Sequence, residues 1–186
     1  VTRPDDLIML PGAVEAVGLV NRAGLAAVLV TNQSGVGRGM MSLPALEAVH
    51  VRLQERLAEA GARLDLILSC VHAPWDGCGC RKPLPGMLNE ARDTLGLDLA
   101  QCVLIGDKPT DIECGATAGC ATALVLSGLE RRCEPAAMKR MPDAVCADVL
   151  EAVKWALNRD IRLFGRAWAR SGDGATEARD DTESPR

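Results

Sequence analysis

Aromatic residues are scarce in this sequence. Its 186 residues include no tyrosine, one phenylalanine and three tryptophans, which amount to 2% of the chain. A close-packed core must therefore be built from alanine, valine, leucine and isoleucine. Stacking of bases on aromatic side chains, by which many proteins bind single-stranded nucleic acid, is not supported by this composition.

Basic charge and long apolar runs are lacking as well. Lys and Arg number 21 against 25 Asp and Glu, so the formal net charge is −4, which gives no attraction for nucleic acid or an anionic membrane. The longest apolar runs, such as Leu25–Val30, are far too short to cross a bilayer. The first residues show no charged and apolar leader with a cleavage site. We therefore expect a cytoplasmic protein with no nucleic-acid partner and no membrane partner.

The length is typical of one domain that can bury a core. From Gly165 onward the residues are mostly Arg, Gly, Asp, Glu, Ser and Thr, with almost nothing to bury. Such a composition is typical of disorder. We expect a single domain over residues 1–164, a disordered tail over 165–186, and a monomer.

Helical and strand patterns alternate along the chain, which predicts an α/β fold of Rossmann type: a parallel sheet with helices on both faces, in three layers. The predicted helices cover residues 13–23, a stretch from Ser42 as N-cap to Gly61, and residues 86–95, 109–118 and 148–157. The predicted strands are Leu25–Val30, Leu64–Ser69, Val103–Ile105 and Thr122–Leu126.

Polar clusters follow three of the four predicted strands. The first is Thr31, Asn32, Gln33, Ser34 and Gly35, the second contains Cys70 and His72, and the third is Gly106, Asp107 and Lys108. Ligands of open parallel sheets bind beyond the carboxyl ends of the strands, so these clusters predict one shared site. The alternative is that short polar turns must follow strands in any case.

Three cysteines and a histidine lie within one 11-residue segment: Cys70, His72, Cys78 and Cys80. Residues two apart in extended backbone point to the same side, so each pair can present two ligands to one ion. Three thiolates and an imidazole match a closed, structural zinc site. Unrelated free thiols are one alternative. A redox dithiol is a weaker one, because its usual spacing is C-x-x-C.

The remaining cysteines are scattered, several of them in apolar stretches. We expect small, reduced and buried side chains at these positions. His50 lies on a predicted helix, with no partner evident from the sequence, as a surface or half-buried residue. The five cysteines are Cys102, Cys114, Cys120, Cys133 and Cys146.

Two cations, Arg81 and Lys82, directly follow the predicted zinc ligands. A metal-stapled loop, residues 70–83, would hold them over the edge of the sheet, where phosphate is the obvious anion. Solvated surface charge is the alternative. The hydroxyls and peptide N–H groups of residues 31–35 would add donors for phosphate, and Gly35, Gly37 and Gly39 permit a close approach of the main chain.

Two carboxylates accompany the third strand. Asp107 at its end is placed to bind Mg²⁺. Asp111, four residues on, would orient Lys108 or a metal-bound water, or else cap the following helix.

Together these residues resemble the haloacid dehalogenase-like phosphatase superfamily, over roughly residues 7–158. The hallmarks are Thr31 at a strand end, Lys82, and the G-D-x-x-x-D segment of Gly106, Asp107 and Asp111. The T-N-Q-S-G segment, the C-x-H…C-x-C-R-K-P run and G-D-K are similar to the capless subfamily of heptose bisphosphate and histidinol phosphatases. The zinc run that continues into R-K-P is the most specific element.

The resemblance implies a Mg²⁺-dependent phosphomonoesterase with a structural Zn²⁺ and a phosphorylated sugar as substrate. Thr31 and Lys82 would stabilise the transferring phosphoryl group, and Asp107 would bind Mg²⁺. Arg81 and Lys108 would contact substrate, and Asn32, Gln33 and Ser34 would add to substrate binding. Ser34 and Lys108 favour the heptose enzyme, because the histidinol enzymes tend to have T-N-Q-D-G and G-D-R.

One hallmark of this family is missing. Its nucleophile lies in a D-x-D-G-T segment after the first, central strand, where one Asp forms an aspartyl-phosphate and the second acts as acid and base. None of the 186 residues forms a D-x-D pair, since Asp5 and Asp6 are adjacent. We expect that the central strand is absent from this chain because it is a fragment or has a late start, rather than a true, inactive truncation.

Three functions stay open at this point. The first is the phosphatase, complete only with an upstream segment. The second is a zinc-stapled protein that binds phosphosugars without hydrolysing them. The third, a zinc-knuckle nucleic-acid binder, is disfavoured by the acidic charge and the lack of aromatics.

Overall fold

The structure is a computed structural model that describes residues 1–128 and 138–159. Within these residues, strands alternate with helices as the sequence predicts. The strands are β1 (Val28–Asn32), β2 (Leu66–Cys70), β3 (Val103–Gly106), β4 (Ala121–Val125) and β5 (Ala144–Cys146). The helices are α1 (Ala13–Arg22), α2 (Ser34–Gly37), α3 (Leu43–Ala58), α4 (Gly86–Leu95), α5 (Pro109–Ala118) and α6 (Val149–Asn158), with 3-10 turns at Pro4–Asp6 and Leu99–Gln101.

The strands form two parallel sheets rather than one. One sheet has the order β1-β2, and the other has the order β3-β4-β5. In the part of the chain that the structure describes, no strand joins β1 to β3. The predicted parallel α/β architecture is therefore confirmed, and the break in the sheet falls between β1, which carries Thr31, and β3, which Asp107 directly follows.

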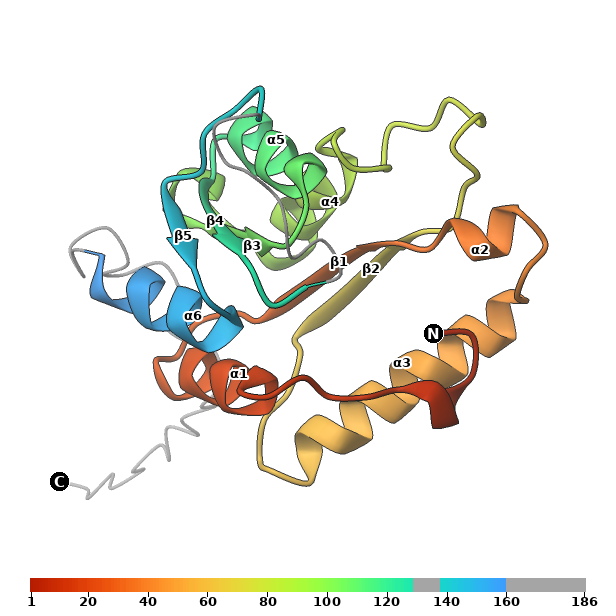
Figure 1. The fold of residues 1–186 in the computed structure, drawn as a ribbon, viewed down its shortest axis with the longest axis horizontal. Helices are drawn as coiled ribbons and strands as arrows, with labels where there is room; N and C mark the ends of the chain where they lie inside the picture. The colour runs from red at the N-terminus through yellow and green to blue at the C-terminus, as the bar shows by residue number, and fades with distance from the viewer. Residues whose placement is uncertain (129–137, 160–186) are drawn as a thin grey trace, which may run out of the picture.

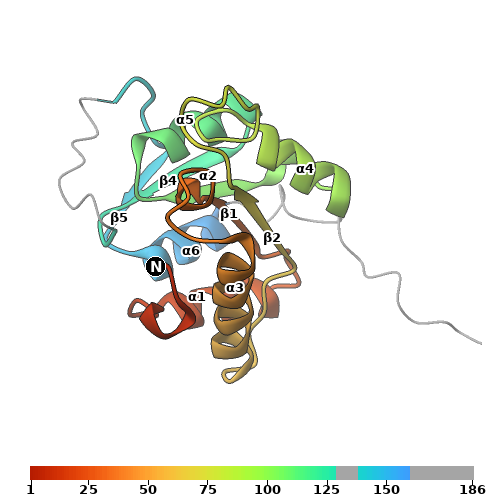
Figure 2. The same cartoon turned by 90° about the vertical axis from the view of Figure 1, so that its right-hand side faces the viewer.

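Helices cover both faces of these sheets, which gives the three layers seen edge-on in Figure 2. Helices α4 and α5 lie on one face, where α4 packs on β1 and β2 and α5 packs on β3 and β4. On the other face, α6 packs on β3, β4 and β5 and also contacts α1 (Figure 1). Helix α3 lies next to β2, as shown by a hydrogen bond of 3.3 Å between His50 Nε2 and Ser69 Oγ.

The core is aliphatic, as the scarcity of aromatics requires. The largest fully buried side chains include Leu46, Leu57, Ile112 and Leu124. Val30 of β1 packs against clusters on both sides of the break in the sheet. Aliphatic side chains therefore supply the apolar area that stabilises this fold.

The ends of the helices are fixed by local hydrogen bonds. Ser42 caps α3 as predicted, because its Oγ accepts the N–H of Ala45 at 3.2 Å. Asp148 caps α6 in the same way through the N–H of Glu151, at 2.9 Å. Helix α5 ends at Ala118 and is followed by Gly119, whose φ of 84° is a conformation that favours glycine.

Several predicted boundaries are wrong. The first strand begins at Val28 rather than Leu25 and includes Thr31 and Asn32, because pairing with β2 decides the strand limits and apolar character does not. The second strand likewise runs from Leu66 to Cys70, so one predicted zinc ligand lies inside it. The turn α2 and the three-residue strand β5 are not predicted, since both are too short to show a periodicity.

Two further expectations concern residues outside the described ones. These are the disordered tail, residues 165–186, and Cys133. Among the described residues, no helix has the length and apolar character to cross a membrane.

Candidate active site

Lys82 links the carboxyl end of β1 to the loop that follows the cysteines. Its N–H donates to Asn32 Oδ1 and its C=O accepts from Asn32 Nδ2, both at 3.1 Å. Its ammonium group donates to the carbonyl of Val30 at 2.8 Å. Lys82 is thus held at both its backbone and its side chain against β1, not solvated at the surface.

The same ammonium group reaches the end of β3. Lys82 Nζ lies 2.7 Å from Asp111 Oδ1, and the two side chains are only 12% and 7% exposed. Since β1 and β3 belong to different sheets, this ion pair brings the polar ends of both sheets to one place. The predicted convergence of Thr31, Lys82 and the G-D-x-x-x-D segment at one rim is what the structure shows.

Asp111 also caps α5. Its Oδ2 accepts the backbone N–H of Lys108 at 3.1 Å, so the capping alternative is correct. The expectation that Asp111 orients the Lys108 side chain is not what the geometry gives, since its side-chain partner is Lys82. The spacing in the sequence indicates only the near neighbour Lys108. It cannot indicate Lys82, which the fold brings to Asp111 from the loop of residues 70–83.

Two glycines make room for the carboxylates. A Cβ on Gly106 would overlap the Asp111 side chain, and a Cβ on Gly128 would overlap the Asp107 side chain. Gly106 belongs to the predicted motif, but Gly128 was not singled out. Its only signal in the sequence is its place three residues after the end of β4.

The remaining predicted substrate residues lie around this rim. Gln33 Nε2 donates to Thr31 Oγ1 at 3.1 Å, and Ser34 begins α2. Arg81 precedes Lys82 in the loop, and its Nη1 is buried without a hydrogen-bond partner among the described residues. A buried guanidinium N–H with no partner is costly unless an anion completes it.

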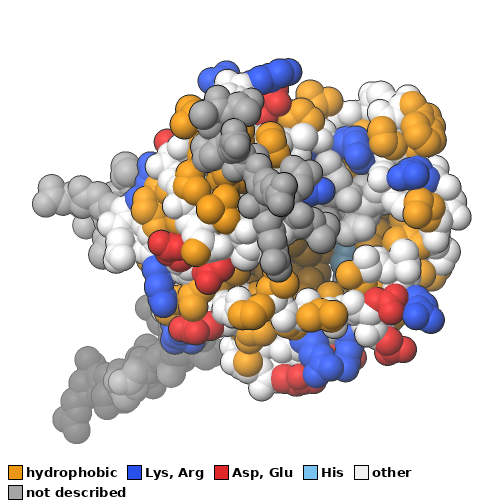
Figure 3. Space-filling view, in the orientation of Figure 1, with side chains coloured by type: hydrophobic (Ala, Val, Ile, Leu, Met, Phe, Trp, Pro, Cys, Tyr) orange, Lys and Arg blue, Asp and Glu red, His pale blue; other side chains and the backbone are white. Residues whose placement is uncertain are grey.

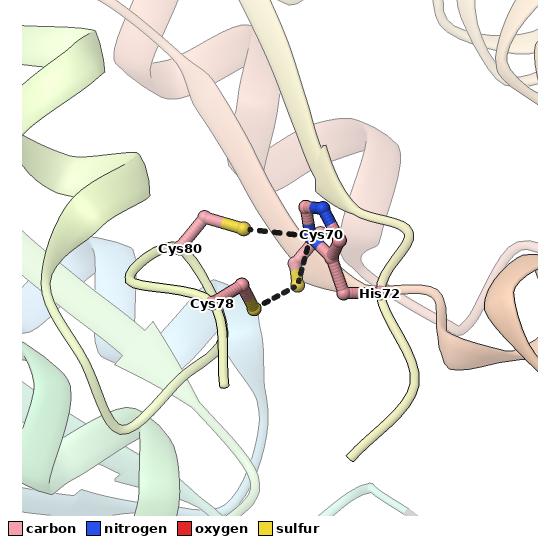
Figure 4. A group of neighbouring side chains, drawn as sticks. All are labelled: Cys70, His72, Cys78 and Cys80. Carbon is pink, nitrogen blue, oxygen red and sulfur yellow. Dashed lines mark hydrogen bonds between the residues drawn. The ribbon is translucent and has the colours of Figure 1, made fainter. Parts of the chain in front are cut away.

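The four predicted metal ligands form one cluster (Figure 4). Their ligand atoms all lie within 4.8 Å of one another. Cys70 Sγ is 3.6 Å from Cys78 Sγ and 3.7 Å from His72 Nδ1, and Cys80 Sγ is 3.3 Å from that nitrogen. Metal–ligand bonds of roughly 2.0–2.3 Å in a tetrahedron separate ligand atoms by about 3.5–3.8 Å, which is close to these distances. The donor set and its spacing therefore fit a zinc ion.

Backbone hydrogen bonds connect the segment that holds this cluster to residues 33–37, which follow β1. The N–H of Gln33 donates to the C=O of Cys70 at 2.7 Å, and the N–H of Gly37 donates to the C=O of Val71 at 2.8 Å. A Cβ on Gly37 would lie 2.5 Å from the backbone nitrogen of Ala73. The turn α2 thus packs main chain to main chain on the zinc loop, which explains why glycine stands at this position.

We expect Gly37→Ala to lower the free energy of unfolding by about 2 kcal/mol, because a methyl group there overlaps rigid backbone rather than a movable side chain. Urea denaturation measures the effect. Gly79→Ala is the matched control, since a Cβ on Gly79 meets nothing within 4 Å, and its change should stay within about 0.5 kcal/mol. Equal effects of both variants would contradict the packing of α2 on the loop.

Of the other described cysteines, Cys114, Cys120 and Cys146 are buried as predicted, whereas Cys102 is only half-buried. Burial raises the pKa of the Cys114 thiol to about 11 and that of Cys120 to about 12. Burial also raises the pKa of Cys102 and of Cys146. These thiols stay protonated at neutral pH and are poor nucleophiles.

His50 is half-buried, which is one of the two predicted outcomes. It has a partner that the sequence does not reveal, since its Nε2 lies 3.3 Å from Ser69 Oγ on β2. Burial lowers the pKa of His50, so this imidazole is neutral at pH 7 and fixes α3 to β2 without a charge.

Known proteins with similar sequences identify the family of this chain. A family model described as HAD-hydrolase-like matches residues 79–152. The D-glycero-beta-D-manno-heptose-1,7-bisphosphate 7-phosphatase of Bordetella bronchiseptica is 42% identical over 132 residues, which are 71% of this chain and 74% of that protein. The chain belongs to the haloacid dehalogenase-like hydrolase family.

A second relative and a solved structure support the same family. The protein of the same description from Pseudomonas aeruginosa is 42% identical over 124 residues, 67% of this chain and 70% of its own length. The crystal structure of the D,D-heptose 1,7-bisphosphate phosphatase from B. bronchiseptica, complexed with magnesium and phosphate, superposes with a TM-score of 0.78. It is 38% identical and covers 84% of this chain and 88% of its own. The fold and family predicted from the sequence are confirmed.

Proposed function

We propose that this haloacid dehalogenase-like chain forms the phosphate-holding part of a Mg²⁺-dependent phosphomonoesterase. Its substrate would be D-glycero-D-manno-heptose 1,7-bisphosphate, hydrolysed at the 7-phosphate. The observation that carries the proposal is the position of the Lys82 ammonium, 2.8 Å from the Val30 carbonyl oxygen of β1 and 2.7 Å from Asp111 Oδ1. Relatives of 42% identity that carry the heptose phosphatase description support the substrate.

Cations and hydroxyl donors of this chain would hold the transferring phosphoryl group. Lys82 and the Thr31 hydroxyl would stabilise the negative charge on its equatorial oxygens. Such stabilisation is the main source of catalysis in phosphoryl transfer. The buried Nη1 of Arg81 would donate to a phosphate oxygen. Because Asp111 fixes Lys82 in place, little reorganisation is needed when the phosphate arrives.

The remaining predicted contacts would face the sugar. Ser34 lies in the segment that follows β1, and Lys108 in the segment that follows β3. With Asn32 and Gln33 they would contact the sugar or its second phosphate. Asn32 acts mainly through its paired bonds to the Lys82 backbone.

Two metal ions fit the residues present. Asp107, a carboxylate at the end of β3, would hold Mg²⁺, an ion that enzymes usually bind through one or two carboxylates together with substrate phosphate. When bound, the ion neutralises negative charge on the phosphoryl group. Cys70, His72, Cys78 and Cys80 would hold a structural Zn²⁺ that shapes the loop bearing Arg81 and Lys82.

A second candidate function rests on one observation. The 186 residues contain no D-x-D pair, which carries the nucleophile in the family that the sequence resembles. A chain with the phosphate-holding residues and without a nucleophile would bind the phosphosugar and not hydrolyse it. Binding by residues 1–186 is expected in both cases, and hydrolysis separates them.

The test is phosphate release by the product of the complete reading frame. With Mg²⁺, it should release phosphate from heptose 1,7-bisphosphate in preference to histidinol phosphate. Release from neither compound, with binding detected by calorimetry, would support the binding protein. Preference for histidinol phosphate would show that the proposed heptose substrate is wrong, while the proposed reaction, hydrolysis of a phosphomonoester, is correct.

Asp107→Asn should abolish the dependence of turnover on Mg²⁺ and lower kcat by roughly 10²–10³-fold, because a neutral amide is a poor ligand for this ion. Steady-state phosphate release over a magnesium titration measures both. Asp93→Asn is the control, since Asp93 is an exposed carboxylate on α4 that pairs only with Arg92 among the described residues. An unchanged kcat in Asp107→Asn would show that the metal ligand is misassigned.

Three further properties remain predictions: one domain over residues 1–164, a monomeric state and a cytoplasmic location. Size-exclusion chromatography with light scattering would test the monomer.

A further inference from the structure

The four residues of the proposed zinc site differ in their access to solvent. Cys70 is 0% exposed, whereas Cys78 and Cys80 are half-buried and His72 is exposed. On the right of Figure 3, where Figure 1 places α2 and the loop after β2, side chains lie open to the viewer. A small oxidant in solution therefore reaches Cys78 and Cys80 before it reaches Cys70.

The buried thiol of Cys70 lies within reach of Cys78. Their Sγ atoms are 3.6 Å apart and point toward each other within the cluster (Figure 4). A disulfide bond brings two sulfur atoms to about 2.0 Å, so a shift of about 1.5 Å between the two side chains closes it. Cys80 Sγ contacts the imidazole of His72 at 3.3 Å. The geometry therefore favours Cys70 and Cys78 as a disulfide pair.

The loop that carries this cluster also connects the two parts of the proposed phosphate site. The C=O of Cys70 accepts the N–H of Gln33 at 2.7 Å, so one metal ligand anchors the segment after β1. Arg81 and Lys82 directly follow Cys80, another ligand. A zinc ion bound by Cys70 and Cys80 thus fixes these two segments relative to each other, and loss of the ion removes that constraint.

We propose that Cys70 and Cys78 form a redox switch, in which hydrogen peroxide converts them to a disulfide and the zinc ion is released. The Cys78 thiolate first attacks one oxygen of the peroxide, the O–O bond breaks, and the other oxygen leaves as hydroxide. The product is a sulfenic acid at Cys78. The Cys70 thiolate then attacks its sulfur, the S–O bond breaks, and a disulfide forms as a second hydroxide leaves.

The balance of this reaction explains why zinc is lost. Two thiolates give two electrons to one peroxide molecule, and two protons convert the two hydroxides to water. A structural zinc site has four ligands, and a cysteine binds the ion as a thiolate, which a disulfide sulfur is not. Only His72 and Cys80 remain, so the site releases the ion. A reductant that restores both thiols restores the site.

The effect of the switch on catalysis rests on the proposed function, because it requires that Arg81 and Lys82 hold phosphate. The formation of the disulfide and the release of zinc do not depend on that function. The chemistry of the switch and its consequence for phosphate can therefore be tested separately.

Peroxide treatment of the zinc-loaded product of the complete reading frame tests the chemistry. A chromogenic chelator should detect one zinc ion released for every two thiols lost, and peptide mass spectrometry should locate a disulfide between Cys70 and Cys78. A dithiol reductant with added zinc should restore the bound ion, as native mass spectrometry measures. Zinc that stays bound during prolonged treatment, or a disulfide that omits Cys70, would overturn the proposal.

Two histidine substitutions separate the roles of the half-buried thiols. Cys78→His and Cys80→His each leave two cysteines and two histidines, which is also a structural zinc set. Cys78→His lacks the attacking thiol and should release zinc at least about tenfold more slowly than the unchanged protein. Cys80→His is the matched control, because it keeps Cys70 and Cys78, and its rate should stay within about threefold. Equal rates in both variants would contradict the role of Cys78; if neither binds zinc, the disulfide found in the unchanged protein decides.

Phosphate release from heptose 1,7-bisphosphate is a separate readout. Oxidation should lower kcat/KM by at least about tenfold, and reductant with zinc should restore it. Zinc release without this loss would contradict control of the phosphate site. No phosphate release before oxidation would contradict the proposed hydrolysis instead. Calorimetry with inorganic phosphate then decides, since affinity that oxidation leaves unchanged would contradict the switch.

Discussion

Lys82→Met is expected to lower the free energy of unfolding by about 3 kcal/mol, because it leaves the carboxylate of Asp111 buried without its cation. The Asp111 side chain is 7% exposed and lies 2.7 Å from Lys82 Nζ. The same substitution should reduce phosphate release by the product of the complete reading frame by roughly 10²–10³-fold, since it removes a charge from the phosphoryl group. Urea denaturation and steady-state kinetics measure the two effects.

A double-mutant cycle distinguishes the stability effect from the catalytic one. Adding Asp111→Asn to Lys82→Met removes the buried charge and should restore part of the stability. It should not restore turnover, because the ammonium group is still missing. Lys154→Met is the control, since Lys154 is an exposed lysine on α6. Full recovery of turnover in the double variant would mean that Lys82 acts only by holding Asp111.

Loss of the metal cluster is the second large effect. Cys70→Ser is expected to lower Tm by more than about 10 °C, because a structural zinc site contributes binding energy directly to folding. Cys70 is fully buried at the end of β2, and its carbonyl holds the N–H of Gln33. Disorder of the loop should therefore reach the T-N-Q-S-G segment as well. Differential scanning calorimetry measures Tm, and native mass spectrometry should detect one zinc ion in the unchanged protein.

Cys102→Ser is the matched control for this substitution. Cys102 Sγ donates to the C=O of Asp98 at 3.2 Å, a bond that a serine hydroxyl can keep. Its Tm should stay within a few degrees of the parent and its zinc content unchanged. A chelator should lower the Tm of the parent and of Cys102→Ser alike. If Cys70→Ser melts like the parent and still binds one zinc, the four-ligand site is wrong.

The sequence alone determined those features that depend on local spacing. Cys70, His72, Cys78 and Cys80 are near in the chain, so their alternation in extended backbone already predicts a metal site, and the cluster confirms that geometry. The alternation of strands and helices predicted the parallel architecture for the same reason. The predicted cap at Ser42 is confirmed for the same reason, because its hydrogen bond spans only three residues.

Only the tertiary structure decided features that join distant residues. It paired the Lys82 side chain with Asp111, which the sequence had linked only to Lys108, a metal-bound water or a helix cap. It also gave His50 a partner on β2 and extended the first strand to Asn32. It also showed an apolar groove between the edges of the two sheets, lined by Val28 and Val30 of β1 and by Val103 and Ile105 of β3. Each of these features depends on contacts between segments that are far apart in the chain. Strand pairing and burial determine such contacts, and local sequence patterns do not predict them.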